Sequence, residues 1–152
     1  MANINIRNTK VFLSLIFISA LLLRLAILYT LPSPELSADA SQYNEIATSI
    51  SEGKGYSLEN GEPTAIRPPL YPFFLAGIYM FLGNTVKIVQ FTQSCLLALV
   101  CIIIFYLGKN IFDLKTGYIA SGLAAVYPLL ICPSYDILSE SLLIFLFSLT
   151  IL

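Results

Sequence analysis

The chain of 152 residues contains no histidine and few charged side chains. The absence of histidine excludes imidazole-based acid–base catalysis and any histidine-containing zinc site within this sequence. Charged residues make up 11% of the chain, whereas soluble domains usually carry about 25%. The hydrophobic share is 57% and the mean hydropathy is +0.83. This composition predicts an integral membrane protein whose main solvent is the bilayer.

Basic stripes and paired cysteines are also missing. The formal net charge is −1, and no basic stripe alternates with aromatic residues, so the sequence does not predict nucleic-acid binding. The three cysteines are Cys95, Cys101 and Cys132, and no pair has the spacing of metal ligands. We expect these thiols to pack as small apolar groups rather than to form a disulfide framework.

Apolar runs predict four membrane spans, at about residues 11–31, 85–107, 117–133 and 138–152. A helix needs about 20 apolar residues to cross about 30 Å of hydrocarbon. A cleaved signal peptide is the alternative for the first run, but its length and Arg24 favour a span. Arg24 either extends toward the interface or faces a polar site. The predicted fold class is therefore all-α and multi-pass.

A shorter apolar run, residues 70–83, does not fit a span. Its 14 residues are too few to cross the bilayer readily. Pro68 and Pro69 favour a helix start, and Gly83 favours the end. We expect an interfacial or re-entrant helix here.

The positive charges predict the topology. If residues 70–83 do not cross, the turn with Lys109 and Lys115 lies on the same side as Arg7 and Lys10, as the positive-inside rule favours. The N-terminus is then cytoplasmic, and a large outer loop extends over residues 32–84.

This outer loop contains a predicted amphipathic helix. Its apolar face has the helical spacing i, i+3, i+4, i+7, formed by Tyr43, Ile46, Ala47 and Ile50. Glycines 53 and 55 end the pattern.

Asp39 stands at the start of this helix and has two candidate roles. With Gln42 three residues later it resembles a capping box, in which Asp39 would be the N-cap. As a solvated acid it is instead a candidate general base. The two roles fit together poorly, because a carboxylate bound to backbone N–H groups has a lowered pKa and is a weaker base.

Arg67 and three tyrosines of the same loop are candidate binding residues. The Arg67 guanidinium suits a phosphate, a lipid headgroup or a neighbouring carboxylate. Tyr56, Tyr71 and Tyr79 either belong to an interfacial aromatic belt or stack on a sugar.

Two acids lie before the last predicted span. Asp136 has the simpler reading of a loop acid, whereas Glu140 is either a helix-start residue that favours the dipole or a functional acid at the membrane edge. The predicted topology places both acids at the same face as Asp39, where helix packing could bring them together.

Two patterns within the spans predict helix contacts. Gly117, Ser121 and Ala125 are four residues apart, and such a stripe of small residues lets another helix approach closely. Gln90 and Gln93 share a face and either hydrogen-bond another helix or line a polar cavity.

The last run, residues 138–152, is about 22 Å long as a helix, short of a full crossing. We therefore expect the N-terminal part of a larger multi-span protein, or a truncated product.

Several motifs, in this order, resemble the GT-C membrane glycosyltransferases. The resemblance is to family 39, which contains protein O-mannosyltransferases and bacterial lipid-sugar transferases such as aminoarabinose transferase. The motifs are DASQYNEIA at 39–47, GY at 55–56, PTAIRPPLYP at 63–72, YP at 127–128 and ILSE at 137–140. They extend over most of the chain, and their order is more specific than any one of them.

The resemblance implies a partial GT-C fold and transfer of a sugar from a polyprenyl-phosphate donor. The acceptor would be a hydroxyl of a lipid, protein or polysaccharide on the non-cytoplasmic side. Asp39 would be the general base, and Arg67 would stabilise the leaving phosphate. Glu140 would hold acceptor, donor or a divalent metal ion. The remaining binding residues would be Tyr43, Tyr56, Tyr71 and Asp136.

The sequence also departs from the family pattern. The acid of the second outer loop is displaced to Glu140, with Ser139 before it, and the histidines of some relatives are absent. A non-catalytic membrane protein, or an inactive fragment that binds partners or lipid-linked sugar, therefore remains the alternative. The resemblance indicates a bacterial inner membrane.

Overall fold

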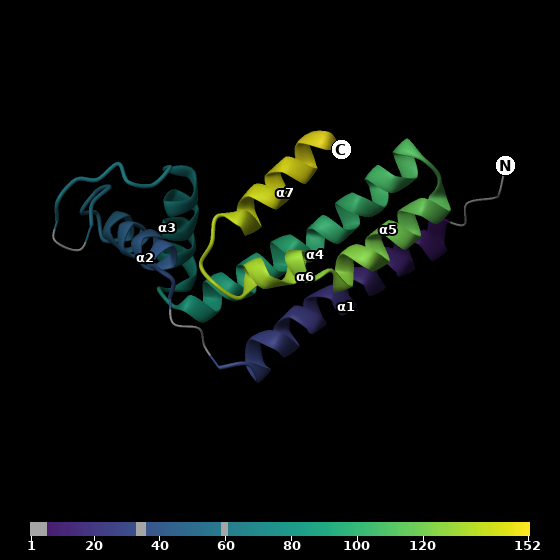
Figure 1. The fold of residues 1–152 in the computed structure, drawn as a ribbon, viewed down its shortest axis with the longest axis horizontal. Helices are drawn as coiled ribbons and strands as arrows, with labels where there is room; N and C mark the ends of the chain where they lie inside the picture. Colours follow the sequence, from purple (N-terminus) through teal and green to yellow (C-terminus); the bar gives the residue numbers. More distant parts are fainter. Residues whose placement is uncertain (1–5, 33–35, 59–60) are drawn as a thin grey trace.

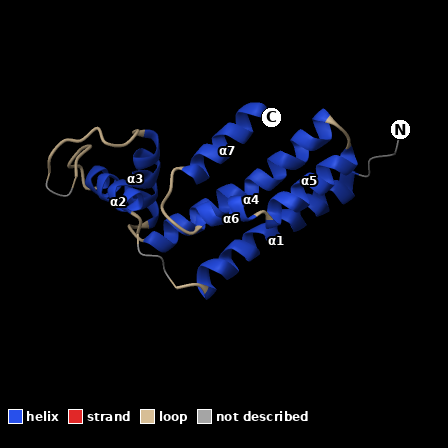
Figure 2. Ribbon diagram, viewed as in Figure 1, coloured by secondary structure: helices blue, strands red, loops and turns tan. Residues whose placement is uncertain are grey.

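The computed structural model describes residues 6–32, 36–58 and 61–152. Residues 33–35 and 59–60 of the predicted outer loop lie outside these ranges. The regular structure of the described residues is helical (Figure 2), as predicted, and β pairing within them is limited to an isolated bridge between Ser57 and Pro63. The elements are α1 (Ile6–Thr30), α2 (Ala38–Ser51), α3 (Leu70–Leu82), α4 (Val86–Ile111), α5 (Leu114–Val126), α6 (Pro128–Ile131), the 3₁₀ turn η1 (Cys132–Ser134) and α7 (Glu140–Ile151).

The helices form two parts. In the bundle (α1, α4, α5, α6, η1 and α7), α4 is central and contacts α1, α5 and α7. In the cap layer (α2, α3 and the described residues of 52–69), α2 and α3 pack against each other. Figure 1 shows the cap layer at the end of the bundle where α4 and α7 begin and α1 ends. The start of α2 and the turn before α7 therefore lie at the same end of the molecule.

The helix lengths support a membrane protein with two or three crossings. Within the described residues, α1 from Arg7 to Thr30 and α4 are long and apolar enough to cross a membrane. A third crossing is counted if α5 and the segment Pro128–Ser134, which are bent by 70°, form one span. α3 and α7 are shorter apolar helices of 13 and 12 residues. The 12-residue α7 is shorter than the predicted fourth span, residues 138–152.

The opposite end of the bundle holds the basic turn. α4 continues to Ile111 and α5 begins at Leu114, so both helices extend into the predicted turn with Lys109 and Lys115. Asp113 is the N-cap of α5, and its carboxylate accepts from the Thr116 backbone N–H at 2.7 Å. The Thr9 and Tyr118 hydroxyls are 3.1 Å apart, which joins the start of α1 to α5 at this end.

The small-residue stripe of α5 faces α4, as predicted. Gly117, Ser121 and Ala125 are all buried. A Cβ atom on Gly117 would lie 2.7 Å from the Phe105 carbonyl oxygen, and one on Gly108 would lie 3.0 Å from the Gly117 Cα. The two backbones therefore touch at a point where any side chain would force them apart.

The break between α5 and α6 divides the single span that the sequence predicts at residues 117–133. Tyr127 is extended, with φ −72° and ψ 120°, and Pro128 begins α6. A residue before proline is driven out of the helical region, and proline has no N–H to continue the ladder. Pro128 was therefore the signal that should have divided this run.

In α2, the capping prediction for Asp39 is wrong. The N-cap is Ser37, whose side chain accepts from the Ala40 backbone N–H at 3.2 Å. Asp39 is the second residue of the helix, and its carboxylate accepts a hydrogen bond from Arg67 instead. The predicted apolar face is confirmed, since Tyr43 and Ile46 are buried.

The buried side of α3 contains two tyrosines that the sequence had assigned to an aromatic belt or a sugar. Tyr71 and Tyr79 are 4% and 6% exposed, so the belt interpretation is wrong for both. The Tyr79 hydroxyl donates to Asn44 Oδ1 on α2 at 2.7 Å. The helix ends where Gly83 adopts φ +100°, a conformation that side chains disfavour.

Candidate functional site

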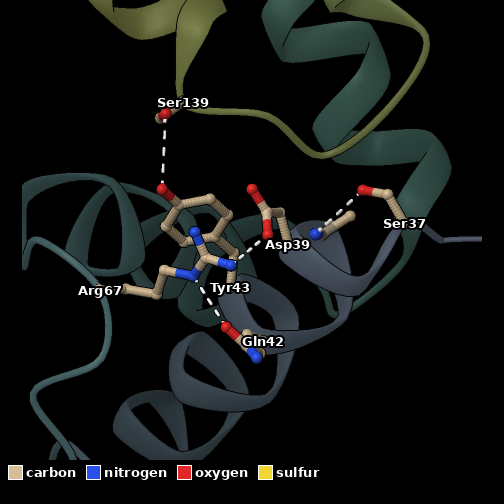
Figure 3. Close-up of polar contacts among 7 residues, drawn as sticks. Ser37, Asp39, Gln42, Tyr43, Arg67 and Ser139 are labelled. Atoms are coloured by element: carbon tan, nitrogen blue, oxygen red, sulfur yellow. Dashed lines mark hydrogen bonds and ion pairs between the residues drawn. The ribbon is translucent and has the colours of Figure 1, made fainter.

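A cluster of polar side chains lies where the cap layer meets the start of α7 (Figure 3). Arg67, in the loop before α3, forms an ion pair with Asp39 through Nη2 and Oδ1. Its Nε donates to Gln42 Oε1 at 2.8 Å. Because Asp39 and Gln42 are three residues apart on α2, they lie on one face and hold two sides of the guanidinium.

Tyr43 connects this pair to α7. Its ring lies under the Arg67 guanidinium, with 5.1 Å between the guanidinium carbon and the ring centroid. Its hydroxyl donates to Ser139 Oγ at 3.5 Å, and its ring meets Tyr71 edge-on at 4.9 Å between centroids. The Tyr43 side chain therefore joins α2, the Arg67 loop, α3 and the turn before α7.

The exposure of the ion pair leaves the acid open to solvent. The Asp39 side chain is 56% exposed and that of Arg67 is 20% exposed. In Figure 3 the second carboxylate oxygen of Asp39 points away from the guanidinium. The hydrogen bond that Arg67 donates to Asp39 raises the pKa of Arg67 above its usual value, so the guanidinium stays charged. The cation of such a pair can bind an anion, and a carboxylate released from the cation in this way can accept a proton from a ligand.

The turn before α7 is held in place by amides of α4. Gln93 Nε2 donates to the Asp136 carbonyl oxygen at 2.7 Å, and Gln93 Oε1 accepts from the Tyr71 hydroxyl at 2.6 Å. Gln90 donates to the carbonyl of Tyr135. Of the two predicted roles of these glutamines, hydrogen bonding to another element is therefore the observed one.

The two acids of this turn differ in placement. The Asp136 carboxylate accepts from the Ile137 backbone N–H at 2.7 Å, which suits a loop acid. Glu140 is the exposed first residue of α7. Burial raises the pKa of Tyr71 strongly, and the negative charges of neighbouring groups, Asp136 and Glu140 among them, add to this shift.

The remaining predicted residue, Tyr56, contacts the backbone of Arg67. Its hydroxyl donates to the Arg67 carbonyl oxygen at 2.8 Å. Together with Arg67 and the proline pair it lines an open hollow of about 570 Å³. Burial raises the pKa of Tyr56.

An apolar groove of about 230 Å³ adjoins the cluster, between the start of α3 and α7. Tyr43 and Ser139 line its polar end, and the rest of its lining is apolar: Pro68, Leu70, Leu142, Leu143 and Leu146, with the ring of Tyr71. The groove therefore joins an apolar channel to hydroxyl groups that lie beside the Arg67–Asp39 pair.

Sequence reasoning missed two contributors to this site. Gln42 was assigned to a capping box, although its position one turn after Asp39 places both on the same helical face. Ser139 was noted only as the residue before Glu140, and its contact with Tyr43 requires the folding of α7 against the cap layer. A long-range contact of this kind has no local signal in the sequence.

Neither a metal centre nor a known relative identifies the site. No group of three or more cysteine, aspartate or glutamate side chains within the described residues is arranged to hold a metal ion. Comparisons with protein-family models, curated proteins and solved structures found no match to the chain. The interpretation of the site therefore depends on its own chemistry.

Proposed function

We propose that this chain functions as a GT-C-type membrane glycosyltransferase of the family-39 kind. It transfers a sugar from a polyprenyl-phosphate donor to an acceptor hydroxyl at the non-cytoplasmic face of a bacterial inner membrane. The observation that supports this most is the Arg67–Asp39 pair next to the apolar groove. A phosphate with a long apolar chain requires a cation beside an apolar channel, and sugar transfer also requires a base.

The proposed reaction uses the two charges separately. The donor phosphate competes with Asp39 for the Arg67 guanidinium, so the carboxylate is released when the donor binds. Asp39 then accepts the proton of the acceptor hydroxyl while the oxygen attacks the anomeric carbon. The bond between this carbon and the phosphate oxygen breaks, and Arg67 stabilises the charge on the departing polyprenyl phosphate.

The proposed membrane arrangement assigns the cap layer to the outer face. α1, α4, the α5–α6 pair and the region of α7 correspond to four spans, and α3 lies at the interface. The lysines of the α4–α5 turn then lie in the cytoplasm, as the positive-inside rule favours. Glu140 lies at the outer face next to Ser139, where it would hold acceptor, donor or a divalent cation.

The test is Asp39→Asn in the full chain, reconstituted in lipid vesicles. Polyprenyl-phosphate mannose and polyprenyl-phosphate aminoarabinose serve as donors, and released polyprenyl phosphate is measured by chromatography. We expect a loss of at least about 100-fold, because a general base contributes about 10² to 10⁴ to the rate. Glu52→Gln is the control, since Glu52 is an exposed acid at the other end of α2 that pairs with Lys54.

Undiminished release by the Asp39 variant would exclude the general base. If the unaltered chain binds polyprenyl phosphate but releases none from either donor, the non-catalytic alternative is favoured.

A further inference from the structure

Arg24 is the largest fully buried side chain of the bundle, with 1% of its surface exposed. The sequence leaves two roles open for Arg24, extension of its side chain toward the membrane interface or contact with a polar site. Its burial shows that the first prediction is wrong. Nη1 donates to the Ala20 carbonyl one turn earlier at 2.9 Å. Nη1 also approaches the Ala125 carbonyl at 3.5 Å, and Nη2 donates to the Leu130 carbonyl at 2.9 Å.

The two distant carbonyls lie on opposite sides of the α5–α6 break. Ala125 is in the last turn of α5, and Leu130 is in the four-residue α6. The last carbonyls of a helix have no partner within it, and in an apolar interior each unpaired group is costly. A break of 70° at Tyr127 and Pro128 therefore needs donors from another element, and Arg24 supplies them.

We propose that Arg24 is a positioning residue that fixes the α5–α6 break and, through it, the turn that carries Ser139. η1 follows α6 directly, and Ser139 comes five residues after its last member, Ser134. The amides of Gln90 and Gln93 hold this turn from α4. Arg24 holds the start of this connection from α1, at Leu130, so the connection is bonded to the bundle at its start and again at residues 133–136, before Ser139.

The chemistry of the guanidinium suits this role better than that of an ammonium group. Its planar fork directs two nitrogens at two carbonyls, whereas a lysine presents its donors from one point. Among the residues that the structure describes, the buried Arg24 Nε atom has no hydrogen-bond partner. The side chain therefore keeps one unsatisfied donor while its terminal nitrogens join the two sides of the break.

The experiment measures the accessibility of Ser139 in nanodiscs, where a thiol reagent reaches both faces. Cys95 and Cys132 are replaced by serine, the fully buried Cys101 is kept because it packs with Ala20 and Ala125 beside Arg24, and one cysteine is introduced by Ser139→Cys. In this background we expect Arg24→Met to raise the labelling rate about fivefold, the effect of losing roughly one net hydrogen bond. A cysteine introduced by Asn110→Cys, in the last turn of α4 at the opposite end, should label at an unchanged rate.

Ser19→Ala is the matched control on α1. Ser19 is exposed, and its hydroxyl bonds to the carbonyl of Ile16 in its own helix, so its loss should leave both labelling rates unchanged. A general loss of stability would raise labelling at both introduced cysteines, whereas the proposed role affects the Ser139 position.

Pro128→Ala makes the test specific to the break. Alanine restores a backbone N–H and relieves the restriction on Tyr127, so the guanidinium should no longer be needed there. In the Pro128→Ala background we expect Arg24→Met to change the labelling rate of the cysteine at position 139 by less than about twofold. This difference between the two backgrounds would show that Arg24 and Pro128 are energetically coupled. Equal effects in both backgrounds, or an unchanged Ser139 rate in the single variant, would overturn the proposal.

Poor accumulation of the Arg24→Met chain is also informative. Recovery of membrane levels in the double variant would support the role at the break, and equal loss in both backgrounds would contradict it. The readout is the placement of a turn, so its failure is distinguishable from a failure of sugar transfer.

Discussion

The bundle and the cap layer are held together in different ways. In the bundle, α4 and α5 approach until Gly108 and Gly117 touch, so the fit depends on the absence of side chains. In the cap layer, several polar side chains of α2 bond to partners outside the helix, as Asn44 does with Tyr79 and Thr48 with Asn84. The comparison teaches that excess volume should damage the bundle most, whereas loss of a polar atom should damage the cap layer.

The largest effect is expected from Gly117→Ala. The new methyl group would meet the backbone oxygen of Phe105, which cannot rotate away, so we expect a destabilisation of about 1–3 kcal/mol. The measurement is the free energy of unfolding in mixed micelles. Gly122→Ala is the control on the same helix, because a Cβ there would meet nothing within 4 Å, and alanine favours the helix by up to about 1 kcal/mol. Equal destabilisation by both substitutions would contradict the close approach.

A smaller effect is expected from Tyr79→Phe, which removes one bond between α2 and α3. The loss of this hydrogen bond should cost about 1 kcal/mol and increase hydrogen exchange in both helices. Tyr127→Phe is the control, since Tyr127 is 51% exposed. Unchanged exchange in the Tyr79 variant would show that the cap layer does not depend on this bond.

The same tyrosine predicts how pH acts on the cap layer. Burial raises the pKa of Tyr79 to about 12, from an ordinary value of 10. Its contribution to stability is complete below about pH 10 and is lost as the pH rises through 12, because the unfolded chain releases the proton first. Protease sensitivity of the cap layer should therefore rise between these values, and less so in Tyr79→Phe.

The smallest effect is expected from Ser37→Ala. Loss of the N-cap should cost about 0.5–1 kcal/mol and should appear as faster exchange in the first turn of α2. Ser37→Asp keeps an acceptor and should restore protection. If Asp39→Asn frayed this turn as much as Ser37→Ala does, the assignment of the cap to Ser37 would be wrong.

The parts that could be predicted from the sequence depend on local patterns. The apolar face of α2 follows from helical spacing, and the bounds of α3 follow from the prolines before it and from Gly83. The all-helical fold follows from apolar composition. Each of these signals acts within one or two turns of chain.

The parts that could not be predicted are contacts between distant segments. Arg24 meets Leu130 across 106 positions, and Tyr43 meets Ser139 across 96. Spacing along the chain does not encode which segments become neighbours. Asp39 shows the same limit over a shorter distance. Aspartate is a common N-cap residue, which favours the local interpretation, whereas its observed partner Arg67 lies 28 positions away.

The short connection between α4 and α5 bears on how the chain enters a membrane during synthesis. Phe112 and Asp113 separate the two helices, and their backbones touch near the turn. The hairpin can therefore close as soon as the first turns of α5 leave the ribosome. We expect α4 and α5 to be inserted together as one unit, with the lysines at its tip retained on the side of synthesis. α7 would then be added to a preformed surface.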